Sequence, residues 1–302
     1  MPSSAPALVV LLLLTSTIAS PLAKRQMNCP PNFRNNVFNT GAAKNPGWPG
    51  TFDTLLQNGV SNWIGFTDRS IESTPNYDPS QGVSAAGTPE LDAAQIPICM
   101  DPTFVNDCIS LLTSCSPPQY MELFNEPDFS FDGYTPLTDA QAAAAALAPL
   151  LAAKTSTQFI TPALAFSNSG YLSQFNDACN NCIIDNNMIV SMHVYNVDPN
   201  VVIQTIEQTH STWPNQRIWV TELAPASASD QNCTYDQSGM INWMQTVIPQ
   251  ILQLGYVDRI FWNSGEYGTL YSDPNAAECN PSLTNPDGSV TPLLQAYSQI
   301  CQ

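Results

Sequence analysis

Eight short apolar segments recur along the chain, and each is followed by a polar loop and then by a stretch with helical periodicity. Short apolar runs bounded by turn-forming residues predict buried β-strands, and their alternation with helices predicts a parallel sheet. The expected strands are Asn36–Asn39, Asn62–Phe66, Ile96–Met100, Gln119–Phe124, Gln158–Pro162, Met188–His193, Ile218–Thr221 and Arg259–Trp262.

The stretches between these segments carry helical patterns. The clearest has Thr138 in the N-cap position and an Ala/Leu-rich run to Ala153. The others are Phe104–Leu112, Val201–His210 and Gly239–Leu254. Strands and helices in this alternation predict the α/β class and a single (β/α)8 TIM barrel. The alternative is a doubly wound open sheet, but the sequence contains no GxGxxG or GxxxxGK[ST] phosphate loop, so the barrel is favoured.

The first residues predict an export signal. The apolar run Ala7–Leu14 is too short for a membrane span of about 20 residues and is typical of a signal-peptide core. The dibasic pair Lys24–Arg25 is either a processing site, which would make Gln26 the first mature residue, or an ordinary exposed pair. We expect a signal peptide and short propeptide at 1–25 and one domain at 26–302, which is secreted and then either released or held in a cell wall.

Nine cysteines in an exported chain predict disulfides. The number is odd, so one thiol is expected to be free, and Cys99 inside an apolar segment is the candidate. The spacing of Cys179 and Cys182 matches half a zinc site, but no second such pair accompanies it, and the two histidines are His193 and His210. We therefore expect no metal and no cofactor.

The charge of the chain limits its partners. The formal net charge is −17, and charged residues make up 11% of the sequence. A polyanion repels nucleic acid and anionic membranes, so neither is expected as a partner, and we expect a monomer. The sequon that begins at Asn232 predicts an exposed, glycosylated position.

Two of the expected strands end in a glutamate. Glu126 follows the fourth strand and is followed by Pro127, which donates no N–H and ends the ladder; Glu222 follows the seventh strand. In a (β/α)8 barrel the carboxyl ends of all strands meet at one rim. A single glutamate there is more often a solvated or capping residue, but two facing glutamates are the pair with which glycosidic bonds are broken.

The flanking residues carry a family resemblance. Asn125-Glu126-Pro127 and Trp219-Val-Thr-Glu222 resemble the acid/base and nucleophile motifs of the retaining glycosidases with (β/α)8 barrels. Within that clan the chain most resembles fungal glycoside hydrolase family 128, the alkali-sensitive-linkage-protein-like glycosyl hydrolases. The matching positions also include Phe124, Asp128, His193–Asn196, Trp262 and Trp63. The resemblance implies that Glu126 is the general acid/base, Glu222 the nucleophile, and Asn125 a donor to the sugar 2-hydroxyl.

Four further residues are candidate substrate contacts. His193 and Tyr195 share one face of the sixth strand and are expected to hydrogen-bond the nucleophile and the sugar, or else to form a core pair. Trp262 and Trp63 are expected to stack on sugar rings, with core packing as the alternative. Trp219 is expected to face away from the barrel interior, opposite to Glu222.

Glu122 shares its strand face with Glu126 and is expected to lie deeper in the barrel. An isolated buried charge is costly, so a structural partner such as Arg34 is expected.

The resemblance implies a secreted retaining hydrolase of β-glucan, most readily β-1,3-glucan. The third strand departs from the family pattern, because Pro97–Asp101 lacks the expected aromatic or polar contact. Two alternatives therefore stay open. One is hydrolysis of another cell-wall polysaccharide, such as β-1,6-glucan or mannan, and the other is a non-catalytic glycan-binding cell-wall protein on the same scaffold.

Overall fold

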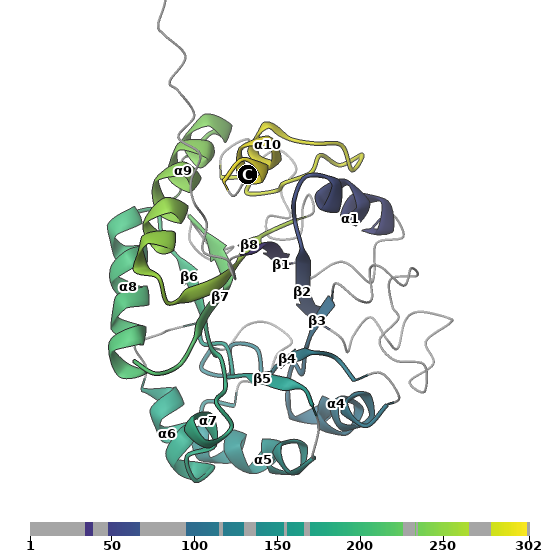
Figure 1. Ribbon diagram of the computed structural model, residues 1–302, viewed down its shortest axis with the longest axis vertical. Helices are drawn as coiled ribbons and strands as arrows, with labels where there is room; N and C mark the ends of the chain where they lie inside the picture. The colour runs from purple at the N-terminus through teal and green to yellow at the C-terminus, as the bar shows by residue number, and fades with distance from the viewer. Residues whose placement is uncertain are drawn as a thin grey trace, which may run out of the picture.

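The computed structural model describes residues 34–38, 48–66, 95–114, 117–129, 137–153, 156–165, 170–225, 233, 235–265 and 279–300. Within these ranges eight parallel strands form one sheet in the order β5-β4-β3-β2-β1-β8-β7-β6 (Figure 1). The strands are β1 Arg34–Phe38, β2 Asn62–Phe66, β3 Gln95–Ile98, β4 Tyr120–Glu122, β5 Gln158–Ile160, β6 Val190–Tyr195, β7 Ile218–Ala224 and β8 Val257–Asn263. The expected leader and processing site at 1–25 and the sequon at Asn232 lie outside the described residues.

The two end strands of this order close the sheet into a barrel. Ile160 at the end of β5 forms a parallel bridge with Ile189, which directly precedes β6. The backbone N–H of Thr161 donates to the carbonyl of Ile189 at 2.8 Å. The expected single (β/α)8 barrel is therefore confirmed, and all eight predicted strands are found close to their predicted positions.

The helices lie outside the barrel wall (Figure 1). They are α1 Trp48–Gln57, the 3-10 turn η2 Pro102–Phe104, α4 Val105–Leu112, α5 Ala140–Ala152, α6 Tyr171–Ala178, α7 Cys182–Asp185, α8 Pro199–Thr212, α9 Gln237–Leu254 and α10 Pro292–Ser298. The predicted N-cap of α5 is one residue off. Asp139, not Thr138, accepts from the N–H groups of Gln141 and Ala142, because a carboxylate satisfies free N–H groups and complements the helix dipole.

The strand side chains divide between two cores. The barrel interior is filled by Ile64, Ile96, Ile98, Ile160, Ile189, Trp219 and Phe261. A larger core lies between the strands and the helices. Alternation along each strand sends successive side chains to opposite sides of the wall. This alternation decides which residues can reach a site at the barrel mouth.

Trp219 corrects the expected facing of β7. Met192 pairs with Val220, but the next pair is His193 with Glu222, so Thr221 is an extra residue at a bulge. In a regular strand, residues three apart face opposite sides. The extra residue shifts this alternation by one, so Trp219 and Glu222 both point into the barrel. The Trp219 ring packs under the guanidinium of Arg259, which lies 4.5 Å from the ring centroid.

Disulfides confirm the expected oxidised state and correct one assignment. The bridges are Cys99–Cys108, Cys179–Cys182 and Cys233–Cys279. Cys99 is therefore not the free thiol, because its neighbour in space is a cysteine on α4. Along the described ranges, none of the helices has both the length and the apolarity to cross a bilayer.

Candidate active site

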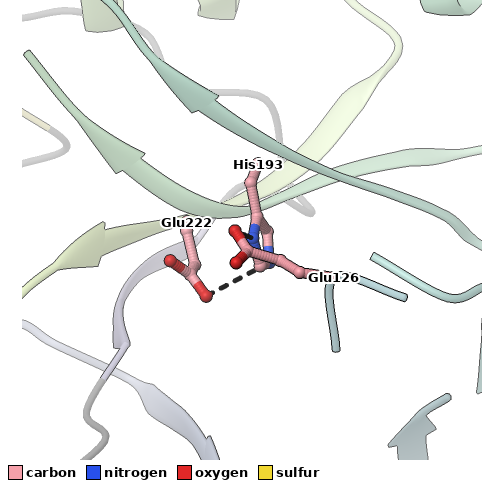
Figure 2. Close-up of side chains that lie close together, drawn as sticks. All are labelled: Glu126, His193 and Glu222. Carbon is pink, nitrogen blue, oxygen red and sulfur yellow. Dashed lines mark hydrogen bonds and ion pairs between the residues drawn. The ribbon is translucent and has the colours of Figure 1, made fainter. Parts of the chain in front are cut away.

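Two glutamates and one histidine meet at the carboxyl ends of β4, β6 and β7 (Figure 2). Nδ1 of His193 lies 2.8 Å from Oε1 of Glu126, and Nε2 of the same ring lies 3.3 Å from Oε1 of Glu222. One ligand atom from each of the three residues lies within 4.8 Å of the others. One imidazole thus contacts both carboxylates.

Backbone contacts on both sides hold Glu126 at the rim. The N–H of Glu126 donates to the carbonyl of Ala163 at 2.7 Å, and that of Asn125 donates to the carbonyl of Met100 at 3.1 Å. Glu126 has a φ of 40°, a region that few non-glycine residues occupy and that Pro127 disfavours further. The surrounding contacts therefore fix a strained backbone at this carboxylate. Asn125 is 3% exposed beside it.

Glu222 is held by neighbours from β6 and β8. The Tyr195 hydroxyl donates to its Oε2, and Nδ2 of Asn263 lies 3.1 Å from the same oxygen. Nδ2 of Asn263 also lies 2.6 Å from the Tyr195 hydroxyl oxygen, which links the two donors. Because donors favour an ionised carboxylate, this arrangement favours the anion of Glu222.

Burial sets the acid–base properties of the cluster. Burial raises the pKa of Glu222 to about 7, against the opposing influence of His193 and the two hydrogen bonds. Burial disfavours the His193 cation, but the charges of Glu222 and Glu126 outweigh that effect and raise the pKa of His193 to about 9. Burial beside Glu222 also raises the pKa of Tyr195 well above its usual value. At neutral pH His193 is therefore a cation between two carboxyl groups.

The two carboxyl groups differ in access to solvent. The side chain of Glu126 is 17% exposed, whereas that of Glu222 is 7% exposed. Glu126 is thus the group better placed to exchange protons with an entering molecule.

The structure brings together five of the seven residues predicted for the site. Glu126, Glu222, Asn125, His193 and Tyr195 lie at the barrel mouth. Trp262 and Trp63 do not, and both are too buried to serve as the expected sugar platforms. Asn263 was missed by the sequence reasoning, although it follows the inward-facing Phe261 by two residues on β8.

Both tryptophans pack outside the barrel wall. Trp262 is fully buried, its Nε1 donates to the carbonyl of Pro281 at 2.7 Å, and its ring packs on Trp243 of α9 and Tyr297 of α10. Trp63 is 1% exposed and belongs to the core between strands and helices. The physical reason is alternation, because both residues occupy outward positions of their strands.

Glu126, His193 and Glu222 are also the described residues that could ligate a cation. Both ring nitrogens of His193 already face carboxylate oxygens, so a protonated imidazole accounts for the short distances without an ion.

These features define a class. A (β/α)8 barrel whose mouth carries a glutamate from the fourth and one from the seventh strand has the architecture of a glycoside hydrolase. The sequence comparison agrees, because residues 41–297 match the glycosyl hydrolase catalytic core family, and the chain belongs to that family. No curated protein matches the chain in sequence.

Solved structures of glycoside hydrolase family 128 share the fold. An endo-β-1,3-glucanase from Amycolatopsis mediterranei, in complex with laminaripentaose, has 16% identity and a TM-score of 0.60 over 88% of this chain and 98% of its own. An exo-β-1,3-glucanase from Cryptococcus neoformans has 18% identity and a TM-score of 0.60 over 88% and 98%. An oligosaccharide-binding protein from the same organism has 17% identity and a TM-score of 0.58 over 93% and 98%. The predicted resemblance to this family is confirmed.

Proposed function

We propose that the protein is a retaining glycoside hydrolase that cleaves β-glucan, with β-1,3-glucan as the preferred substrate. The observation that carries this proposal is the closeness of the two carboxylates, whose facing oxygens lie within 4.8 Å of each other. Retaining enzymes hold their carboxyl groups about 5 Å apart, whereas inverting enzymes separate them by roughly 6.5 to 9.5 Å to admit a water. The short separation supports double displacement.

The two glutamates take different roles. Glu222 attacks the anomeric carbon and forms a glycosyl ester, while Glu126 gives its proton to the leaving oxygen. Glu126 then takes a proton from a water that attacks the ester and releases the sugar. The donors Tyr195 and Asn263 and the low exposure of Glu222 support its assignment as the nucleophile. The greater exposure of Glu126 supports its assignment as the proton carrier.

His193 supports both carboxyl groups. Its Nδ1–H donates to Glu126, and the positive ring lies beside Glu222. The cation favours the ionised nucleophile, and the hydrogen bond fixes which oxygen of Glu126 faces the substrate. Asn125 is proposed to bind the 2-hydroxyl, an interaction that strengthens at the transition state.

The proposed substrate class rests on the solved structures that share the fold of this chain. Family 128 structures of the same fold include endo- and exo-β-1,3-glucanases, which supports β-1,3-glucan over β-1,6-glucan or mannan. Others are oligosaccharide-binding proteins, which makes binding without cleavage the second candidate. The apolar leader and the disulfides support our proposal that the protein works outside the cell.

The test is hydrolysis of laminarin, pustulan and mannan by the wild type, Glu126→Gln and Glu222→Gln, with Glu207→Gln on the exposed face of α8 as the matched control. We expect laminarin to be cleaved by the wild type and the control, and each site variant to lose roughly a thousandfold or more in kcat. Tight binding of laminarin without cleavage would support the binding protein instead. Equal cleavage by the site variants would contradict the assignment of both residues.

A further inference from the structure

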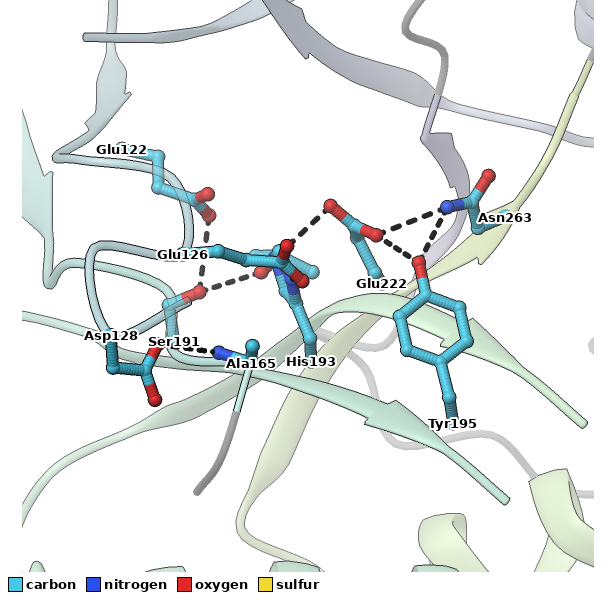
Figure 3. Close-up of polar contacts among 10 residues, drawn as sticks. Glu122, Glu126, Asp128, Ala165, Ser191, His193, Tyr195, Glu222 and Asn263 are labelled. Atoms are coloured by element: carbon cyan, nitrogen blue, oxygen red, sulfur yellow. Dashed lines mark hydrogen bonds and ion pairs between the residues drawn. The ribbon is translucent and has the colours of Figure 1, made fainter. Parts of the chain in front are cut away.

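A second polar layer lies beneath the catalytic residues (Figure 3). Glu122 is the last residue of β4 and precedes Glu126 by four residues. Ser191 precedes His193 by two residues on β6, and Thr221 directly precedes Glu222 on β7. The Ser191 hydroxyl lies 3.1 Å from Oε2 of Glu122 and 2.6 Å from Oγ1 of Thr221. The three strands that bring Glu126, His193 and Glu222 to the site therefore each supply a member of this layer as well.

Glu122 is the one acidic member, and its surroundings disfavour an ion. It is 0% exposed, and its backbone neighbours in the wall are Ile98 of β3 and Ile160 of β5. Its Oε1 has no hydrogen-bond partner among the residues the structure describes. An ionised carboxylate in an apolar site needs several donors, and the hydroxyls of Ser191 and Thr221 are the two that favour the ionised form here, against a larger effect of burial.

Charged groups face Glu122 from three neighbouring elements. His193 lies above it on β6 and favours its ionised form, while Glu222 on β7 opposes that form. On β8, the guanidinium of Arg259 is engaged lower in the barrel by the rings of Tyr120 and Trp219. In the described part of the chain, no lysine or arginine forms an ion pair with Glu122. Among the described residues Glu122 is therefore hydrogen-bonded by Ser191 and paired with no cation. The predicted partner was Arg34, whose side chain lies outside the described residues, so that pairing stays a prediction.

Burial outweighs the opposing influence of His193 and raises the pKa of Glu122 to about 8. Near pH 7, where Glu222 begins to ionise, Glu122 accordingly keeps most of its proton. A third negative charge at this depth would oppose the ionisation of Glu222, since like charges disfavour each other's charged forms.

We propose that Glu122 is a positioning residue that works as a neutral carboxylic acid: through Ser191 and Thr221 it fixes His193 and Glu222 without adding charge to the site. This inference rests on the proposed function for its kinetic consequence, but not for the geometry or the protonation state. Ser191 is the central member, because it contacts both other residues and lies on the same strand face as His193.

The kinetic test compares Glu122→Leu, Glu122→Gln and Ser191→Ala at pH 6. Leucine removes the hydrogen bond and should lower kcat on laminarin about tenfold with little change in KM, because positioning acts on the reacting groups and not on the bound sugar. Glutamine is neutral, of the same size and keeps an acceptor for Ser191, so it should restore most of the loss. Ser191→Ala should show the same loss of kcat with Glu122 in place. This variant still tests the proposal if Glu122→Leu does not fold.

A second measurement tests the protonation state without substrate. Difference infrared spectroscopy should show a protonated carboxyl band at pH 7 in the wild type that Glu122→Gln lacks. The chain has two histidines, so the ¹⁵N spectrum of histidine-labelled protein resolves His193 from His210, and its shifts at pH 6 should be the same in the wild type and Glu122→Gln.

The opposite results overturn the inference. If Glu122 works as an anion, Glu122→Gln will lose activity as Glu122→Leu does, the ¹⁵N shifts of its His193 at pH 6 will differ from those of the wild type, and no carboxyl band will be lost. If the protein cleaves no glucan, the proposed function fails, and the infrared and ¹⁵N results still decide whether Glu122 is neutral.

Discussion

At the scale of single residues, the site depends on one imidazole that contacts carboxylates from two other strands. Both ring nitrogens of His193 are committed to carboxylates, one to Glu126 and one to Glu222. Two pKa values follow from this closeness: that of Glu222 is raised to about 7 and that of His193 to about 9. The protons of the cluster therefore exchange near neutral pH, where a general acid and a nucleophile must coexist.

Asn263 offers a test of how its hydrogen bond influences the pKa of Glu222. Asn263→Ala removes one donor to the ionised form of Glu222, so the pKa of Glu222 should rise further above 7. Because the nucleophile must be ionised, the acid limb of kcat/KM should move to higher pH, and kcat should fall about tenfold. Measured pH–rate profiles check this, with Glu207→Gln as the control. An acid limb that stays at the wild-type pH would contradict the role given to Asn263.

At the scale of elements, the sequence predicted what depends on periodicity and missed what depends on a single inserted residue. All eight strands were found, because buried parallel strands are continuous apolar runs. The bulge at Thr221 leaves no such signal, and the facing of Trp219 was wrong for that reason. Trp262 was misplaced although a clue existed, since Phe261 and Asn263 on either side of it both face inward.

The N-cap of α5 gives a prediction at this scale. Asp139→Ala removes the acceptor for two free N–H groups and should lower the free energy of unfolding by about 1 kcal/mol. Asp139→Asn keeps an acceptor and should lose much less. Urea unfolding of the two variants measures the difference. Equal stabilities would show that the cap does not contribute.

At the scale of the whole molecule, the sequence predicted the barrel, the meeting of Glu126 and Glu222 at one rim, and His193 and Tyr195 beside Glu222. It did not predict the contact of His193 with Glu126 or those of Ser191 with Glu122 and Thr221. Strand order brings Glu126 and Glu222 to one rim in any such barrel, so their pairing follows from position. The contacts of His193 with both carboxylates, and of Ser191 with Glu122 and Thr221, depend on the relative stagger of β4, β6 and β7. Single-strand patterns do not report that stagger.

Burying these titratable groups has a consequence for overall stability. The native state raises the pKa of Glu122 from 4.5 to about 8, that of Glu222 from 4.5 to about 7 and that of His193 from 6.5 to about 9. At any pH between the unfolded and the folded pKa of a group, the folded protein holds a proton that the unfolded chain has released. Stability should therefore fall as pH rises from 4.5 to 9, by at most about 1.4 kcal/mol per pH unit for each retained proton.

Denaturant unfolding across this pH range measures the effect. Glu122→Gln removes one of the three retained protons, so its stability should depend less steeply on pH than that of the wild type. Wild-type stability that stays constant or increases between pH 5 and pH 8 would contradict the protonation states assigned to the site.

Double displacement by Glu126 and Glu222 determines the anomeric configuration of the first sugar released. Proton NMR of laminarin hydrolysis, recorded before mutarotation, distinguishes the two anomers. We predict that the β-anomer appears first, because two inversions at the anomeric carbon restore its configuration. First appearance of the α-anomer would mean a single displacement by water and would contradict the role of Glu222 as nucleophile.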